Sequence, residues 1–156
     1  MNISIRKARI EDIPRIKRID RFGNQLRRYS GLDRLDRNYK PKKNEKGYFE
    51  TFVTGKKKWC YVAEQKNMLV GFALFNIENR AAYFKIKKVG YIDLVYVDKN
   101  ARGKGVAKML MNTLISIFSQ EGIKHLKLAV HTDNPAHKAW KRLGFKDYRA
   151  EMWKKL

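Results

Sequence analysis

Cysteine is almost absent from this chain of 156 residues, since Cys60 is the only one. An internal disulfide is therefore excluded, which agrees with a reducing compartment. Cys60 lies in the apolar run WCYVA with no group beside it that would activate a thiol. We interpret it as a buried strand residue and not as a nucleophile. His131 and His137 lack the further ligands that a metal site needs, so we predict no metal site.

Long apolar runs are also missing. No stretch approaches the roughly 20 apolar residues that cross a bilayer, so no membrane span is predicted. The N-terminal stretch MNISIRKARIEDI lacks the apolar core of a signal peptide, and we expect a cytoplasmic protein. The length, with 44% hydrophobic and 12% aromatic residues, predicts a single globular domain over residues 1–156.

Acidic side chains are scarce: 15 Asp and Glu stand against 36 Lys and Arg, for a formal net charge of +21. The excess is +11 up to Arg80 and +10 beyond it, so it is not confined to a tail. Such a field attracts anions and repels polycations. A nucleic-acid or ribosome partner, an acidic ligand and a merely solvated basic surface all stay open on charge alone.

The pattern of apolar residues predicts an α/β (α+β) fold. Alternation predicts strands at 2–8, 58–64, 69–78, 88–97 and 124–131, with one or two more from Phe145 to Leu156. Helical spacing predicts helices from Glu11 to Leu26 and at 48–54, 106–121 and 135–143. The strand, glycine turn, helix and strand from Lys88 to His131 imply a right-handed parallel crossover. We therefore expect a mixed, mostly antiparallel sheet of six to seven strands.

The segment from Arg28 to Gly47 has little apolar content and predicts a long basic loop. Loops of this length inside a compact domain are more often functional or mobile than idle.

Two glycines and several cations stand where the central helix should begin, in VDKNARGKGVAKML. A helix N-terminus offers unpaired N–H groups and about half a positive charge. Glycines there let a phosphate approach the backbone, and Arg102, Lys104 and Lys108 add positive charge. The stretch is neither a Walker loop nor a GxGxxG fingerprint. An ordinary surface turn and a phosphate-binding turn therefore both fit it.

A second stretch, DNPAHKAWKRLGF, follows about thirty residues later. Together the two resemble the GCN5-related N-acetyltransferase (GNAT) superfamily, whose [QR]xxGx[GA] motif matches Arg102 to Ala107. The family's downstream N..A…Y…GF pattern is matched at Ala136, Gly144 and Phe145, and Trp140 stands in register at its tyrosine position. The order of predicted elements fits the family over the whole chain, and the resemblance implies helices on both faces of the sheet.

The resemblance implies acetyl-CoA as the cofactor. Its pyrophosphate would lie on the turn formed by Arg102, Gly103, Lys104, Gly105, Val106, Ala107 and Lys108. Its pantetheine arm would pair with the strand end formed by Val95, Tyr96 and Val97, where the parallel strands separate. Asn134, Ala136 and Trp140 complete the implied cofactor site.

The sequence departs from the family pattern at two places. The family's asparagine position falls on Asp133 when it is counted back from the GF pair, whereas Asn134 is one residue closer. The tyrosine that often protonates the departing thiolate is replaced by Trp140, whose indole can pack on the cofactor but does not titrate.

Transfer to an amine also requires a base, because the attacking amine must lose a proton. Asp93 is the first candidate: period-two alternation places it on one strand face with Tyr91 and Val95, before a bulge expected near Tyr96. A purely structural role for Asp93, as a cap or as the partner of a lysine, stays open. His131 is the alternative base, and Tyr148 is a third candidate, as an acid in place of the missing tyrosine.

The resemblance implies an N-acetyltransferase. We expect its acceptor to be a primary amine on a protein or peptide, an N-terminus or a lysine, because the field of a +21 chain repels polyamines and aminoglycosides. The alternative is a basic nucleic-acid- or ribosome-associated module on the same fold. The sequence identifies neither the acceptor nor the oligomeric state.

Overall fold

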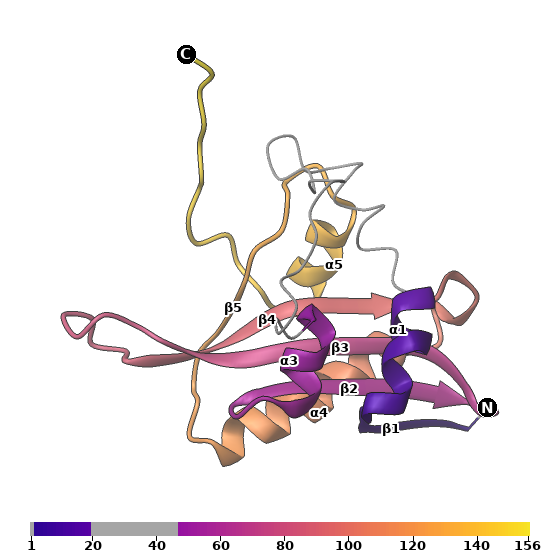
Figure 1. Cartoon of the computed structure of the whole chain (residues 1–156). Helices are drawn as coiled ribbons and strands as arrows, with labels where there is room; N and C mark the ends of the chain where they lie inside the picture. Colours follow the sequence, from indigo (N-terminus) through magenta and orange to yellow (C-terminus); the bar gives the residue numbers. More distant parts are fainter. Residues whose placement is uncertain (1, 20–46) are drawn as a thin grey trace.

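The computed structural model describes residues 2–19 and 47–156 (Figure 1). Its elements, in chain order, are β1 (Ile3–Lys7), η1 (Ile10–Asp12), α1 (Ile13–Ile19), α3 (Tyr48–Thr54), β2 (Lys58–Gln65), β3 (Met68–Asn79), β4 (Lys88–Val97), η2 (Lys99–Ala101), α4 (Val106–Gln120), β5 (Leu126–Leu128) and α5 (Ala136–Arg142). The part of the predicted helix beyond Ile19 lies outside the described residues, as does the basic loop predicted from Arg28 to Gly47, apart from Gly47 itself.

The described strands form one sheet in the order β1-β2-β3-β4-β5. The first four strands pair antiparallel, and β5 runs parallel to β4 after the chain has crossed over through α4. This topology confirms the mixed, mostly antiparallel sheet with a parallel strand–helix–strand unit. The expected strand count of six to seven was too high, because the described residues contribute five.

The final strand or strands expected from Phe145 to Leu156 are not formed. After α5 the chain runs away from the sheet (Figure 1), and Tyr148, Met152 and Trp153 are exposed. An alternating pattern makes a strand only where a neighbouring strand takes up its backbone hydrogen bonds. No described strand pairs with this segment, so its pattern was not sufficient evidence.

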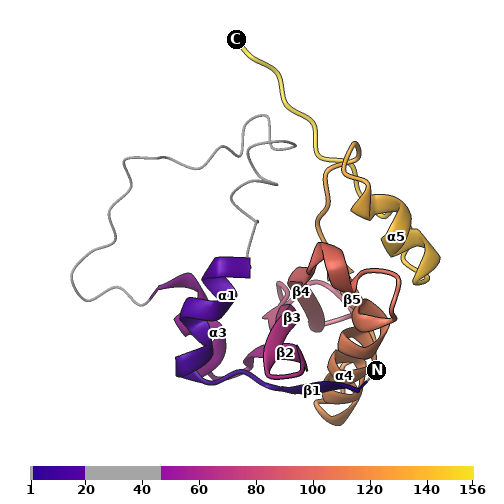
Figure 2. The same cartoon turned by 90° about the vertical axis from the view of Figure 1, so that its right-hand side faces the viewer.

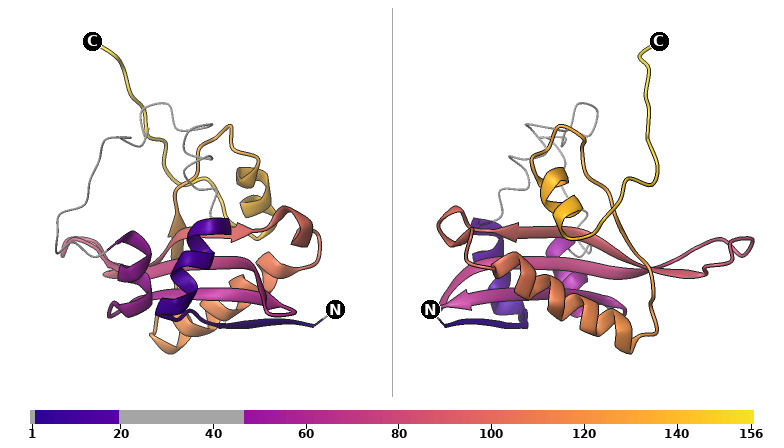
Figure 3. Two further views of the ribbon diagram at one scale, coloured as in Figure 1. Left: turned by 45° about the vertical axis from the view of Figure 1, so that its right-hand side comes forward. Right: turned by 180° about the vertical axis from the view of Figure 1, so that it is seen from behind.

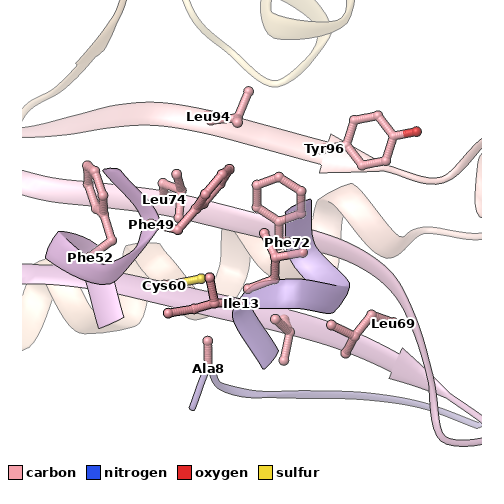
Figure 4. Close-up of a cluster of buried hydrophobic side chains, with 12 residues drawn as sticks. Ala8, Ile13, Phe49, Phe52, Cys60, Leu69, Phe72, Leu74, Leu94 and Tyr96 are labelled. Carbon is pink, nitrogen blue, oxygen red and sulfur yellow. The ribbon is translucent and has the colours of Figure 1, made fainter. Parts of the chain in front are cut away.

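Helices cover both faces of the sheet, as the resemblance implied (Figure 2). On one face, α1 and α3 enclose a cluster of side chains that includes Ile13, Phe52 and Phe72 (Figure 4). On the other face, Leu110, Leu114 and Phe118 recur at every fourth residue of α4 and are fully buried. Burial of such a side chain stabilises the fold by about 1.5–3 kcal/mol.

Cys60 lies in β2 inside the cluster under α1 and α3 and is fully buried. Burial raises the pKa of its thiol to about 12, because the thiolate would be desolvated there. The thiol therefore stays protonated and unreactive near neutral pH, which confirms the interpretation of Cys60 as a buried strand residue.

Asp12 is the one charged side chain that is buried among the described residues. Its Oδ2 and Oδ1 accept hydrogen bonds from Arg6 Nη1 and Nη2 at 2.7 and 2.9 Å, and Oδ2 also accepts from the Arg9 amide at 2.8 Å. These bonds lower the pKa of Asp12, those from Arg6 having the largest effect. They tie the start of the first helical segment to β1.

None of the described helices is long and apolar enough to cross a membrane.

Candidate functional site

The parallel strands β4 and β5 separate after three residue pairs, from Gly90–Leu126 to Ile92–Leu128. β4 continues for five more residues to Val97, still paired with β3 on its other side. Among the described residues no strand pairs with these five on the β5 side. A stretch of main chain along one edge of β4 is therefore open to another extended chain.

The glycine turn follows this stretch after the short helix η2. Gly103 and Gly105 have φ angles of 75° and 79°, in the left-handed region that other residues rarely adopt. A Cβ atom at either position would meet nothing within 4 Å. The glycines are therefore required by the backbone conformation, and the space in front of the turn is open. Arg102 Nε donates to the carbonyl of Val97 at 3.1 Å and ties the turn to the end of β4.

The turn leads into the N-terminus of α4. The Met109 amide donates a hydrogen bond to the Gly105 carbonyl at 3.0 Å, and this is the first bond of the helix. The N–H groups of Val106, Ala107 and Lys108 precede this bond and point out of the helix start. The side chain of Val106 is buried, so that residue can offer only its main chain to a ligand.

The surface of the turn is positive. Arg102, Lys104 and Lys108 are exposed, and the first turn of α4 contains no acidic residue. Backbone N–H groups, a helix dipole and cations are the groups with which proteins bind a phosphate or pyrophosphate. The residues present therefore fit the pyrophosphate of acetyl-CoA.

The side chains at the end of β4 are occupied by the two cores. Tyr96 is buried in the cluster under α1 and α3, whereas Val95 and Val97 pack against the α4 side. Val95, Tyr96 and Val97 can therefore contact a cofactor mainly through their backbone groups, as the pairing implied by the resemblance requires.

A β-bulge in β4 falls at Asp93 and not near Tyr96, where we expected it. Leu94 pairs with Leu74 and Ile92 pairs with Phe75, so Asp93 is the extra residue. The bulge shifts the alternation of side chains between the two faces of the sheet by one residue. Ile92 and Val95 therefore both lie on the face that packs against α4. The prediction that Val95 shares a face with Asp93 and Tyr91 was therefore wrong.

Asp93 is half-buried at this bulge, where its Oδ2 accepts a hydrogen bond from Asn76 Nδ2 of β3. Burial raises the pKa of the carboxyl group, and the hydrogen bond from Asn76 and the charge of Lys58 oppose that rise. No ion pair within the described part of the chain joins Asp93 to a lysine. A carboxylate with a raised pKa beside an open strand edge suits proton transfer.

The second motif folds around Asn134. Its Oδ1 accepts a hydrogen bond from the Ala136 amide at 2.9 Å, and its own amide donates to the His131 carbonyl at 3.0 Å. Asp133 is exposed. Asn134, and not Asp133, therefore holds the turn that precedes α5. Trp140 is half-buried and packs edge-on against Phe145, with ring centroids 5.4 Å apart.

The other candidates lie after β5. His131 is half-buried three residues beyond that strand. Tyr148 is 87% exposed in the segment after α5, so no packing orients its hydroxyl. His137 lies 2.6 Å from Asp147, which Lys141 also contacts at 2.6 Å. Within residues 2–19 and 47–156 no three His, Cys, Asp or Glu side chains form a metal site.

Sequence reasoning missed Asn76 as a member of the site. The sequence feature that could have indicated it is the single amide side chain in the otherwise apolar stretch LVGFALFNIE of β3, which is that of Asn76. Such a residue marks a polar contact on an otherwise apolar strand.

Solved structures of the same fold include BH1408 from Bacillus halodurans, with a TM-score of 0.81 at 19% identity over 98% of this chain and 99% of that one. A predicted acetyltransferase with acetyl-CoA from Clostridium acetobutylicum has a TM-score of 0.71 at 22% identity, over 99% and 96%. An aminoglycoside acetyltransferase from an uncultured soil sample has a TM-score of 0.69 at 15% identity, over 99% and 96%.

A curated relative is an uncharacterized N-acetyltransferase of Methanocaldococcus jannaschii, 29% identical over 120 residues. The match covers 76% of this chain, which spans about half (52%) of the relative's length. The sequence profile of the Acetyltransferase (GNAT) family matches residues 28–145 and thus includes both the glycine turn and the Asn134 segment. The chain belongs to the GNAT family of acetyltransferases.

Proposed function

We propose that this chain transfers the acetyl group of acetyl-CoA to a primary amine on a protein or peptide. The observation that carries the proposal is the open edge of β4 from Asp93 to Val97, which is followed, after η2, by the positive glycine turn at the start of α4. An extended pantetheine arm needs the first feature, and a pyrophosphate needs the second.

The proposal assigns binding to main-chain groups more than to side chains. The amides of Val106, Ala107 and Lys108 would hold the pyrophosphate, with charge from Arg102 and Lys104. The Asn134 turn and the half-buried Trp140 would border the cofactor on the β5 side. Acetyl-CoA, when bound, supplies an activated acyl group and a thiolate leaving group.

Asp93 is the proposed general base. Only a neutral amine attacks a thioester, so the protein must take a proton from an ammonium group or from the attacking amine. The raised pKa makes the ionised carboxylate a stronger acceptor, and the hydrogen bond from Asn76 holds it in one orientation. His131 is the alternative base. The exposed Tyr148 has no positioning that supports it as an acid, so the thiolate would take its proton from solvent.

The acceptor is proposed from charge and protonation. An α-amine with a pKa near 8 is neutral about a tenth of the time at pH 7, whereas a lysine with a pKa near 10.4 is neutral in about one molecule in several thousand. The field of a +21 chain disfavours the approach of multiply charged amines. An N-terminus, or a lysine on a neutral or acidic protein surface, is therefore ranked above polyamines and aminoglycosides.

Two measurements test the proposal. Acetyl-CoA at one hundred times its dissociation constant should stabilise the protein by about 2.7 kcal/mol. A panel of peptides, acidic proteins, spermidine and an aminoglycoside, followed by release of free thiol, should show the fastest turnover with a peptide or protein. Faster turnover of spermidine or of the aminoglycoside would overturn the choice of acceptor, and the absence of acetyl-CoA binding would overturn the activity.

A further inference from the structure

A two-stranded projection, the β3–β4 finger (residues 78–89), extends past the rest of the sheet. β2 pairs with β3 only as far as Asn76, and β5 pairs with β4 only from Gly90 onward. The Ile77 amide still donates to the Lys57 carbonyl, and from Glu78 to Val89 the two strands β3 and β4 pair with each other alone. The view from behind shows the finger reaching clear of the helices (Figure 3). At the base of the finger Val89 is buried and Glu78 forms an ion pair with Lys127 at 2.8 Å. Residues 81–88 are exposed and are therefore open to a partner.

The tip of the finger exposes aromatic side chains. Tyr83 is 84% exposed and Phe84 is 38% exposed, and Ile86 lies beside them. The two rings contact each other with centroids 4.7 Å apart. A turn of this kind needs polar or flexible residues and has no need of aromatic ones. A ring as exposed as that of Tyr83 is available for stacking.

The finger is also strongly basic. It carries Arg80, Lys85, Lys87 and Lys88, and no acidic residue stands between Glu78 and Asp93. The Arg80 guanidinium lies 3.8 Å from the centroid of the Phe84 ring. The Arg80 amide donates to the Lys87 carbonyl at 2.8 Å. These contacts order the tip before any partner binds.

We propose that the β3–β4 finger binds single-stranded nucleic acid. Tyr83 would stack on a base, and Lys85 and Lys88 would contact the adjacent phosphates. Exposed rings beside cations are the combination with which proteins bind single strands, because each base offers a flat face and each linkage a negative charge. An acidic protein would use only the cations, and a duplex would offer no unstacked base to Tyr83.

The finger and the acetyl-CoA site lie at opposite ends of β4. Lys88 begins the strand and Val97 ends it before the glycine turn, a span of about 30 Å at about 3.3 Å per residue. Nucleic acid on the finger should therefore leave the phosphate turn free. The proposal does not rest on the acetyltransferase function.

The stacking contact is tested by fluorescence anisotropy with labelled 12-nucleotide oligouridylate RNA and oligothymidylate DNA. Stacking of one base contributes about 1–3 kcal/mol, so Tyr83→Ala should weaken binding of either strand at least fivefold. Tyr148→Ala is the matched control, because Tyr148 is equally exposed but lies off the finger. Equal affinities of the two variants would overturn the proposal. Thermal unfolding should show the same stability for both.

The phosphate contacts are tested by salt dependence. Each phosphate contact with a single strand contributes about 0.7 to the magnitude of the slope of log affinity against log salt concentration. The double variant Lys85→Gln/Lys88→Gln removes two contacts and should therefore lower that magnitude by about 1.4. Lys66→Gln/Lys154→Gln removes the same charge elsewhere and should change the slope by less than half as much. Equal changes would show that the overall field alone binds the strand and would overturn the proposal.

Two competitors complete the test. Polyglutamate should fail to displace the oligonucleotide at equal charge concentration, and displacement would point to an acidic protein partner instead. Saturating acetyl-CoA should leave the affinity unchanged. Competition by acetyl-CoA would place the strand on the glycine turn and would likewise overturn the proposal.

Discussion

Asp93 of β4 accepts a hydrogen bond from Asn76 of β3 at the one point where the pairing of these two strands shifts register. The bulge and the bond belong together, because the extra residue gives Asp93 a position that regular pairing would not. Burial raises its pKa while the amide favours its charged form. This pair is the structural basis of the proposed proton transfer.

Asp93→Asn should remove the base while keeping the volume of the side chain. We expect turnover to fall by about two to four orders of magnitude, with acetyl-CoA affinity unchanged. Because burial raises the pKa of Asp93, ionisation above its unfolded pKa of about 3.9 destabilises the folded state. The variant should therefore be at least as stable as the parent at pH 7. Steady-state kinetics and urea unfolding measure the two effects.

The matched control is His131→Gln, which removes the alternative base. If Asp93 is the base, this variant should lose less than tenfold in turnover. A large loss in His131→Gln with little loss in Asp93→Asn would transfer the role to His131. Losses below tenfold in both would mean that the protein only positions the reactants and that solvent moves the protons.

Asn76→Leu tests the positioning role of the amide. The hydrogen bond from Asn76 lowers the pKa of Asp93, so its loss should raise that pKa further. The acidic limb of the profile of kcat/KM against pH should then move to higher pH. Relative to the parent, Asn76→Leu should lose more activity at low pH than at high pH. Asn79→Leu, an exposed position on the same strand, should leave the profile unchanged. An unshifted limb in Asn76→Leu would contradict the pairing.

The sequence predicted the strands and helices that depend on local patterns. β4 was predicted with its observed bounds, and the limits of β2 and β3 differ from the prediction by one residue. The long helix α4 was predicted from its buried residues at helical spacing. The glycine turn was also visible, because its constraint is a local backbone conformation.

The features that depend on partners distant in sequence were not predictable. The bulge at Asp93 arises from the pairing of β4 with β3, and Asn76 lies 17 residues away from the carboxylate that it contacts. The segment after Phe145 has a strand-like pattern, yet no described strand pairs with it. A pattern in one segment shows which face can be buried but not which segment will cover it.

Gly105→Ala tests the phosphate turn. Alanine at a φ of 79° is strained, so the turn should change its conformation, and the added methyl group would occupy space that is open in front of the turn. We expect at least a tenfold loss of acetyl-CoA affinity by calorimetry. Gly122→Ala is the matched control: Gly122 has a φ of 72° and open space too, but it lies at the far end of α4. Equal affinities of the two variants would remove the turn from the cofactor site.

Asp12→Asn tests the brace between β1 and the first helical segment. The Arg6 guanidinium holds the pKa of Asp12 below its usual value, so the interaction is fully present above the unfolded pKa of about 3.9. It is lost as the pH falls through the lowered folded pKa. The variant leaves Arg6 without its main partner in a half-buried position and should lose about 1–3 kcal/mol of unfolding free energy at pH 7.

The difference between Asp12→Asn and the parent should narrow as the pH falls below the unfolded pKa of about 3.9, because the parent then loses the same interaction as Asp12 becomes protonated. Asp147→Asn is the control. Asp147 also has a lowered pKa, through Lys141 and His137, but it is exposed, and exposed pairs contribute little to stability. Urea unfolding at pH 7 and pH 3 should therefore show a pH-dependent loss for Asp12→Asn and almost none for Asp147→Asn. A loss for Asp12→Asn that stays constant between the two pH values would mean that packing, and not the charge of Asp12, holds this corner of the fold.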